Sequence, residues 1–222
     1  MYRKTLIVKD EIYHVFNRSV GKLPIFLSRR DYERAIEVFK FYLHNKPPLR
    51  FSYYNRLTDD QKRKLSEEII QSHEKVVEII CFCLMPNHFH FLLKSLTEDG
   101  IKQFISNFQN SYAKYFNTKT NRNGTLFQQN FKAVRIESDE QLIHVSRYIH
   151  LNPVTSYLMD AKDMENYQWS SYYDYFKENS PPYLTKDLVL TNFKSYKEYK
   201  QFTLDQVNYQ RELDKIKHLI LE

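Results

Sequence analysis

The sequence Leu84-Met85-Pro86-Asn87-His88-Phe89-His90-Phe91-Leu92-Leu93 places two histidines, two residues apart, inside an apolar run. Side chains at positions i and i+2 of a β-strand point to the same face. His88 and His90 would therefore present two imidazoles side by side, and Phe89 and Phe91 would point to the opposite face. Two imidazoles on one rigid strand supply half of a metal site. A purely structural role is the alternative for each histidine.

Strand and helix patterns alternate on both sides of these histidines. Strands are expected at 12–17, 76–84, 88–96 and within 125–136, and helices from Ser28 to the stop at Lys46-Pro47-Pro48, at 97–117, and at 138–151, where Asn152-Pro153 would end the helix. Pro86 and Asn87 favour a turn, so the two strands that flank them should form a hairpin. This order predicts an α+β fold with a ferredoxin-like antiparallel sheet and helices packed on one face.

Two segments depart from this alternation. Residues 49–75 are polar and charged, with a short helical pattern over 58–72, which predicts an insertion between a helix and a strand. The chain beyond residue 175 carries two more helical patterns, at about 187–200 and 203–221. We therefore expect one domain over residues 1–175, which contains the insertion, and a C-terminal helical extension over 176–222.

The composition favours a polyanionic partner and argues against a membrane protein. The net charge is +6, and the chain has 18 tyrosines and 16 phenylalanines, which can stack on bases where they do not fill the core. No apolar run reaches the roughly 18 residues of a membrane span, and no signal peptide follows Met1. Cys81 and Cys83 are badly placed for a disulfide with each other, so we expect buried, reduced thiols and a cytoplasmic protein.

A second group of reactive residues lies on the helix expected at 138–151. Tyr148 and Asn152 are four residues apart, so they share one face of a helix. The Tyr148 hydroxyl can act as a nucleophile, and the Asn152 amide oxygen can bind a metal ion.

Several short motifs of the chain occur in this order in one family of transposases. They are Tyr13 to Arg18, Pro86 to His90, Gly124 to Phe127 followed by Phe131-Lys132, Tyr148 to Val154, and Trp169 to Tyr172. Together they resemble the REP-associated tyrosine transposases, which are single-tyrosine HUH transposases. The resemblance covers roughly residues 5–175, and its specificity lies in the joint order and spacing of the motifs.

The resemblance implies an activity and a set of site residues. In that family, two histidines and a polar residue one turn after the tyrosine hold a divalent ion. Carried onto this chain, His88, His90 and Asn152 would bind Mg²⁺ or Mn²⁺. Tyr148 would be the catalytic nucleophile and would form a 5′-phosphotyrosine link to single-stranded DNA. The expected enzyme cleaves and rejoins single-stranded or hairpin DNA at hairpin-forming repeats, as a monomer or a homodimer.

Other residues compete for roles in such a site. Arg18, Lys132 and Arg135 are candidates for DNA phosphate contacts because each ends or interrupts an apolar strand, with solvated surface charge as the alternative. Tyr112 and Tyr115 are rival nucleophiles, but they fall on the apolar face of their helix, and this position favours core packing. His14 and His150 are expected in core, hydrogen-bonding or DNA-contact roles.

Two other functions share parts of this pattern. A rolling-circle or relaxase nuclease would use the same pair of histidines, but the single obvious tyrosine in a Tyr-Ile-x-x-Asn-Pro pattern argues against it. A domesticated protein that binds hairpin DNA or RNA without cutting it would have no need of the complete set of His88, His90, Tyr148 and Asn152.

Overall fold

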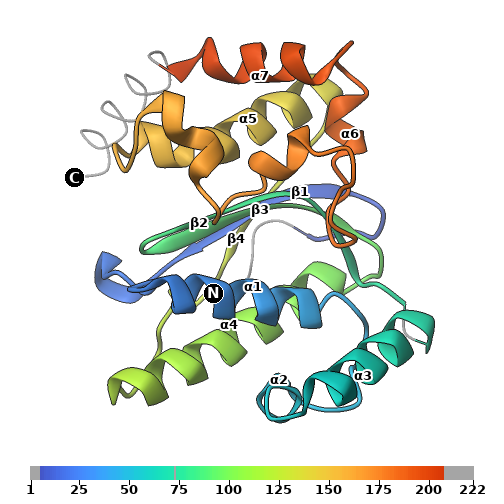
Figure 1. The fold of residues 1–222 in the computed structure, drawn as a ribbon, viewed down its shortest axis with the longest axis vertical. Coiled ribbons are helices and arrows are strands. Elements are labelled where there is room, and N and C mark those ends of the chain that lie inside the picture. The colour runs from blue at the N-terminus through green and yellow to red at the C-terminus, as the bar shows by residue number, and fades with distance from the viewer. Residues whose placement is uncertain (1–5, 73, 208–222) are drawn as a thin grey trace.

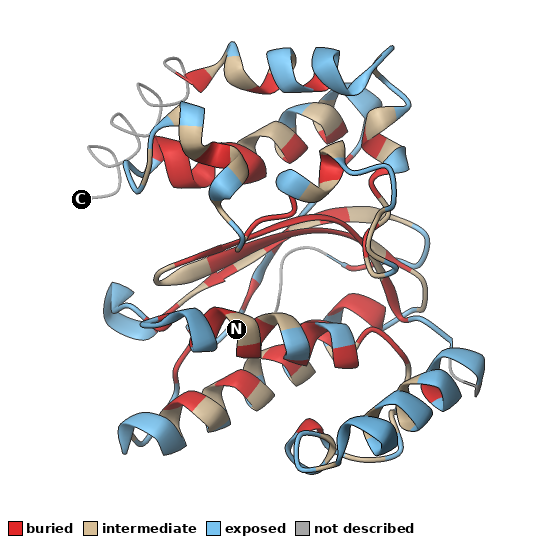
Figure 2. Cartoon of the chain, in the orientation of Figure 1, coloured by how far each residue is buried: buried red, intermediate tan, exposed pale blue. Residues whose placement is uncertain are grey.

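The computed structural model describes residues 6–72 and 74–207, which form three layers. A four-stranded sheet lies between two layers of helices (Figure 1). The outward faces of the helices are largely exposed, and the strands are buried between the layers (Figure 2).

The sheet has the strand order β2-β3-β1-β4, with every neighbouring pair antiparallel. Its strands are β1 (Ile12–Arg18), β2 (Val77–Met85), β3 (His88–Ser95) and β4 (Lys132–Arg135). Pro86 and Asn87 turn β2 into β3, as predicted. Each of the two strand–helix–strand units passes over one intervening strand, which gives the ferredoxin-like arrangement. The predicted α+β class and antiparallel sheet are confirmed.

Helices α1 (Arg29–Phe41) and α4 (Gly100–Thr120) cover one face of the sheet. The apolar residues of α4 recur at helical spacing and meet the phenylalanines that alternate with the histidines on β3. The Phe108 ring centroid lies 5.2 Å from that of Phe89 and 5.7 Å from that of Phe91. This face is therefore an aromatic core without site residues.

Helix α5 (Asp139–Thr155) covers the opposite face, which corrects the expectation that the helices pack on one face. The reason is visible in the burial of the sheet. Strands β2 and β3 are buried on both faces for most of their length, as their nearly continuous apolar sequences require. An alternating pattern with one polar face would have left one side to solvent.

Helix α5 also extends beyond its predicted end. It continues through Pro153 to Thr155, and the Ser156 amide then donates to the Asn152 carbonyl. A proline in the last turn of a helix removes one hydrogen bond without ending the helix at once. Asn152 consequently lies inside α5 rather than at its boundary.

The predicted insertion forms two helices, α2 (Phe51–Tyr54), which the sequence pattern did not indicate, and α3 (Asp59–Ser72), which it did. The insertion packs against the end of α1 through aromatic rings, with Phe51 5.4 Å and Tyr54 4.8 Å from Phe41 between ring centroids. It therefore lies in the same layer as α1 and α4 (Figure 1).

The C-terminal extension lies over α5. It contains α6 (Asp187–Leu190) and α7 (Tyr196–Leu204), so the helix predicted over 187–200 is interrupted, and most of the one predicted over 203–221 lies outside the described residues. Short 3₁₀ helices occupy Val20–Lys22, Ala161–Asn166 and Tyr173–Phe176.

The outer edge of β2 pairs with the segment that follows the 3₁₀ helix Ala161–Asn166. The Leu84 amide donates to the Trp169 carbonyl, and the Ser171 amide donates to the Phe82 carbonyl. Covering an edge strand in this way removes a template for unwanted pairing. Cys81 and Cys83 on β2 are buried free thiols, as predicted. Within the described ranges, none of the helices has the length and apolar character needed to cross a membrane.

Candidate active site

The sheet register places His88 and His90 on the face that α5 covers. His90 pairs with Phe16 of β1, and Phe16 pairs with Lys132 of β4, so these three side chains form a row across the sheet. His88 pairs with Arg18 in a parallel row at the strand end. The prediction that both histidines share one face is confirmed, and the two ring centroids are 5.0 Å apart.

Helix α5 brings Tyr148 onto this histidine face. Its half-buried ring stands edge-on to His90, with 5.6 Å between the centroids, and edge-on to His14, with 5.8 Å. The 60 residues that separate His88 from Tyr148 in sequence fold as β3, α4 and β4 and return the chain to the other side of the sheet. The nucleophile expected from the sequence thus lies beside the expected metal ligands.

Asn152 lies one helical turn after Tyr148 and connects it to His88. Its side-chain amide nitrogen donates to the Tyr148 carbonyl over 2.9 Å, and the Asn152 side chain also hydrogen-bonds to His88. Asn152 is 4% exposed. Asn152 therefore joins the backbone of Tyr148 to the His88 ring.

Asn87, which the sequence assigns only to the turn, fixes the His88 ring. Its Oδ1 accepts a hydrogen bond of 2.6 Å from His88 Nδ1, so the proton sits on Nδ1 and Nε2 keeps its lone pair. Burial, together with the nearby Arg18 charge, lowers the pKa of His88 to about 4 against the opposing effect of Asn152. His88 is therefore a neutral imidazole at neutral pH, the form that binds metals.

His14 holds the second histidine in a similar way. His14 Nε2 and His90 Nδ1 are 2.9 Å apart, so the two rings are joined through these nitrogens. His14 was expected to hydrogen-bond or pack, and its alternation with Ile12 and Phe16 already placed it on one face of its strand. Its contact with His90 depends on the pairing of β1 with β3, which no local pattern specifies.

The three basic residues proposed for DNA contact do not lie together. Arg18 and Lys132 share the histidine face, and the Lys132 ammonium lies 5.9 Å from the Phe16 ring centroid. Arg135 pairs with Tyr13 across the ladder and so points to the other face, where its guanidinium forms an ion pair of 2.6 Å with Glu11. Only Arg18 and Lys132 are placed to meet a strand bound at Tyr148.

The two alternative nucleophiles, Tyr112 and Tyr115, lie on the side of the sheet opposite Tyr148. Tyr112 is buried on α4 and donates its hydroxyl to the Ile25 carbonyl, and Tyr115 donates to Asp31, with its pKa raised to about 12 by burial and this bond. His150 on α5 is fully buried and turned away from the histidine face, so a structural role replaces the DNA contact considered for it.

The residues present suit a weakly bound cation that prefers oxygen ligands and whose coordination shell is completed by its substrate. Among the described residues no three His, Cys, Asp or Glu side chains form a group that could hold a metal ion by themselves. The donor set of His88, His90 and Asn152 offers two imidazole nitrogens and one amide oxygen. Mg²⁺ and Mn²⁺ need further oxygen ligands, which water and a phosphate can supply.

Comparisons with known proteins found one family and one fold similar to this chain. Residues 47–152, just under half of the chain, match the family described as "Transposase IS200 like". No curated protein matches the chain. A solved structure of a REP-associated tyrosine transposase bound to a REP hairpin is similar in fold, with 16% identity, a TM-score of 0.50, and coverage of 85% of this chain and 92% of that chain. The matched segment contains all four predicted site residues, and both matches agree with the resemblance that the motifs indicated.

Proposed function

We propose that this protein is a transposase that cleaves and rejoins single-stranded DNA through Tyr148, with Mg²⁺ or Mn²⁺ held by His88, His90 and Asn152. The observation that carries the proposal is the meeting of α5 with β3. One helical face presents a hydroxyl and an amide to two imidazoles whose other ring nitrogens are already hydrogen-bonded. A purely structural cluster would have no need of this preorganisation.

The residues divide the chemistry between them. Tyr148 Oη would attack the phosphorus of a phosphodiester, form an O–P bond, and displace the 3′ oxygen, which leaves as a 3′-hydroxyl after taking up a proton. The 5′-phosphotyrosine link keeps the energy of the broken bond, so reversal by a second 3′-hydroxyl would rejoin DNA without a nucleotide cofactor. A bound cation would polarise the scissile phosphate and stabilise the charge that develops on its oxygens.

The substrate proposed is single-stranded DNA next to a hairpin. A hairpin is bound by the solved transposase of similar fold, and this chain has a net charge of +6 with Arg18 and Lys132 on the histidine face. These two cations would contact phosphates on either side of the one that Tyr148 attacks.

A covalent-adduct assay tests the proposal. The protein is incubated with 5′- and 3′-labelled hairpin DNA carrying single-stranded flanks, with and without Mn²⁺, and run on a denaturing gel. Wild type should form a metal-dependent adduct that carries the label 3′ of the cut, and Tyr148→Phe should form none. Tyr173→Phe, an exposed tyrosine on the 3₁₀ helix Tyr173–Phe176, is the matched control and should behave as wild type.

Two results would overturn the proposal. An adduct that persists in Tyr148→Phe would mean that another residue is the nucleophile. Tight hairpin binding with no cleavage of any flanked substrate would favour the non-cleaving binding protein.

A further inference from the structure

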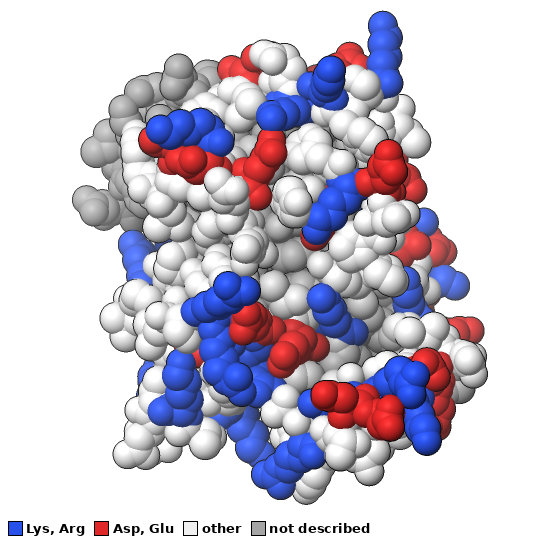
Figure 3. All heavy atoms as spheres, in the orientation of Figure 1, with Lys and Arg blue, Asp and Glu red and all other residues white. Residues whose placement is uncertain are grey.

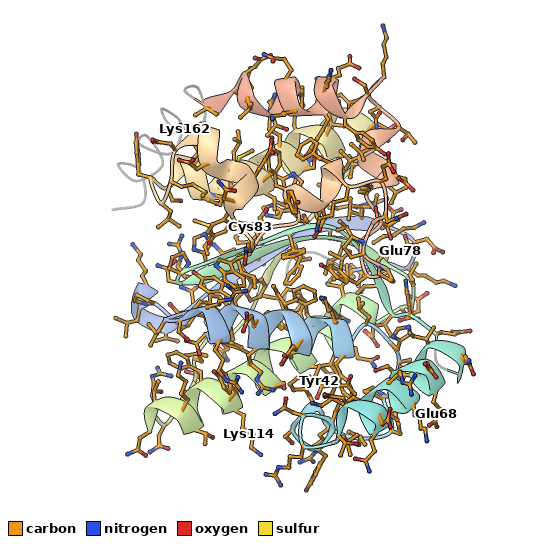
Figure 4. All side chains as sticks on the ribbon, viewed as in Figure 1. Tyr42, Glu68, Glu78, Cys83, Lys114 and Lys162 are labelled. Carbon is orange, nitrogen blue, oxygen red and sulfur yellow. The ribbon has the colours of Figure 1, made fainter. Side chains whose placement is uncertain are left out.

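A second polar groove lies on the side of the sheet away from Tyr148. It runs between the insertion helix α2 and helix α4, with α1 at its base, and has a volume of about 800 Å³. Tyr42, at the end of α1, and Lys114, on α4, line it and are labelled in Figure 4. A cavity of this size can hold the backbone of several nucleotides and is much larger than one small ion needs.

The groove is strongly basic. Five of its fourteen lining residues are Lys or Arg, and none of the fourteen is Asp or Glu. Figure 3 shows Lys and Arg side chains, with Asp and Glu side chains among them, over the layer formed by α1, α4 and the insertion. The cationic lining residues are Arg34, Arg50, Arg56, Lys114 and Lys119.

Two of these charges are already compensated and three are not. Lys119 is ion-paired with the buried Asp31 at 2.7 Å, and Arg34 lies 3.6 Å from Glu37. Arg50, Arg56 and Lys114 are exposed and make no ion pair within the described part of the chain. Three uncompensated cations around an acid-free groove would attract a polyanion.

Arg34 lines the groove from α1 and is held between two aromatic rings. It is 8% exposed, and its guanidinium lies between the rings of Phe51 and Tyr115, at 5.3 and 5.1 Å from their centroids. Its Nε has no hydrogen-bond partner. A buried N–H left unpaired costs about 1–3 kcal/mol, and the rings that enclose this guanidinium form the floor of the groove.

Helix α4 adds a row of hydrogen-bonding side chains along the groove. Asn107, Ser111, Lys114 and Thr118 recur every three or four residues and line the cavity. From the first to the last the helix rises about 16 Å. Phosphates along one strand of B-form DNA are about 3.4 Å apart on the axis, so the row matches roughly five nucleotides.

We propose that this groove binds the sugar–phosphate backbone of a single-stranded flank of the DNA substrate. The inference rests on the proposed function for the identity of its ligand. Arg50, Arg56 and Lys114 contact phosphates of this strand. The row of side chains on α4 follows one line along the groove, which suits the backbone of a single strand. The insertion is thus an anchoring element for DNA outside the cleavage site.

Equilibrium binding tests the proposal without cleavage. Dissociation constants are measured for a fluorescent hairpin with single-stranded flanks, over a range of salt concentrations, in the Tyr148→Phe background. Adding Arg50→Gln and Arg56→Gln should weaken binding about tenfold and reduce the salt slope by about 1.4, since each single-strand phosphate contact contributes about 0.7. Lys64→Gln with Lys197→Gln, two exposed lysines away from the groove, removes the same charge and should change neither value.

A second substrate and a second variant sharpen the result. A blunt hairpin without flanks should bind the groove variant and the control equally, and Lys114→Glu should repeat the loss for flanked DNA. Affinity and slope that match the control would overturn the proposal, as would an equal loss for the blunt hairpin. Thermal unfolding of each variant separates lost contacts from lost folding. Adduct formation by wild type is scored separately, so failure of cleavage and failure of the groove give different results.

Discussion

His14 Nε2 lies 2.9 Å from His90 Nδ1, across the pairing of β1 with β3. Through this contact His14, which is not one of the expected site residues, orients the ring of His90, which is one. If His90 binds a cation through Nε2, its Nδ1 carries a proton and donates to His14. Such outer partners set the orientation and basicity of a ligating imidazole.

Replacing His14 should therefore weaken metal use. His14→Ala is expected to raise the Mn²⁺ concentration for half-maximal adduct formation by about 10–100-fold, the usual cost of removing such a partner. His14→Gln, which keeps a hydrogen-bonding group, should recover part of the loss. His144→Ala, on the exposed side of α5, is the control. A metal titration of His14→Ala that overlays wild type would show that His90 needs no such support.

Asn152 should contribute its oxygen to the cation. Asn152→Leu keeps the size of the side chain but removes the oxygen, and we expect at least tenfold more metal to be needed, by the cost typical of disturbed sites. Asn152→Asp supplies a harder oxygen and should lower the Mg²⁺ requirement, at some cost in stability, because the position is buried. The measurement is the same metal titration, and equal midpoints for all three proteins would remove Asn152 from the ligand set.

The buried His150 should make stability depend on pH. Burial lowers its folded-state pKa from 6.5 to about 3, so between these values the unfolded chain binds a proton that the folded chain does not. The contribution of His150 to the free energy of unfolding is therefore complete above pH 6.5. It decreases as the pH drops toward 3, by up to about 1.4 kcal/mol per pH unit. Urea unfolding of wild type at pH 7 and 5 should show the loss, and His150→Gln should show a smaller slope. Equal slopes would mean that other groups cause the acid sensitivity.

Gly100 and Gly124 form a matched pair for substitution by alanine. A Cβ at Gly100 would lie 2.1 Å from the Val76 carbonyl oxygen, whereas Gly124, at a φ of +89°, has open space around it. Gly100→Ala should cost about 3 kcal/mol of unfolding free energy through a backbone clash. Gly124→Ala should cost only about 1 kcal/mol through its left-handed conformation. Denaturant melts would check the order, and a smaller loss at Gly100 would contradict it.

The sequence was sufficient for the elements and for most of the candidate site. Period-two alternation gave β1 and β3, and helical spacing gave α1, α4 and α5, because each pattern follows from local geometry. His88 and His90 followed from strand alternation alone. Tyr148 and Asn152 followed from helical spacing, although only the family resemblance connected them to the histidines.

The errors arose where long-range packing decides the outcome. Placing α5 on the second face of the sheet required knowing that β2 and β3 are buried on both faces. An apolar run in the sequence does not distinguish a strand covered on one face from a strand covered on both. Arg135 faces away from Tyr148 because of its register opposite Tyr13 on β1. The insertion was identified as polar, but its contribution of Arg50 and Arg56 to a groove with α4 depends on tertiary contact.

The surroundings of His150 connect the helix of the candidate site to the C-terminal extension. Its ring nitrogens meet the Tyr199 hydroxyl at 2.7 Å and the Ser171 hydroxyl at 2.9 Å, and Ser171 is also bonded to the Phe82 amide of β2. His150 lies midway between Tyr148 and Asn152 in the sequence. Its hydrogen bonds to Tyr199 and Ser171 therefore hold the turn of α5 that carries these two residues. A chain shortened before Tyr199 would keep every reactive group and lose the alignment between them. The extension thus positions the helix that carries Tyr148 and Asn152 through Tyr199, a residue outside the candidate site.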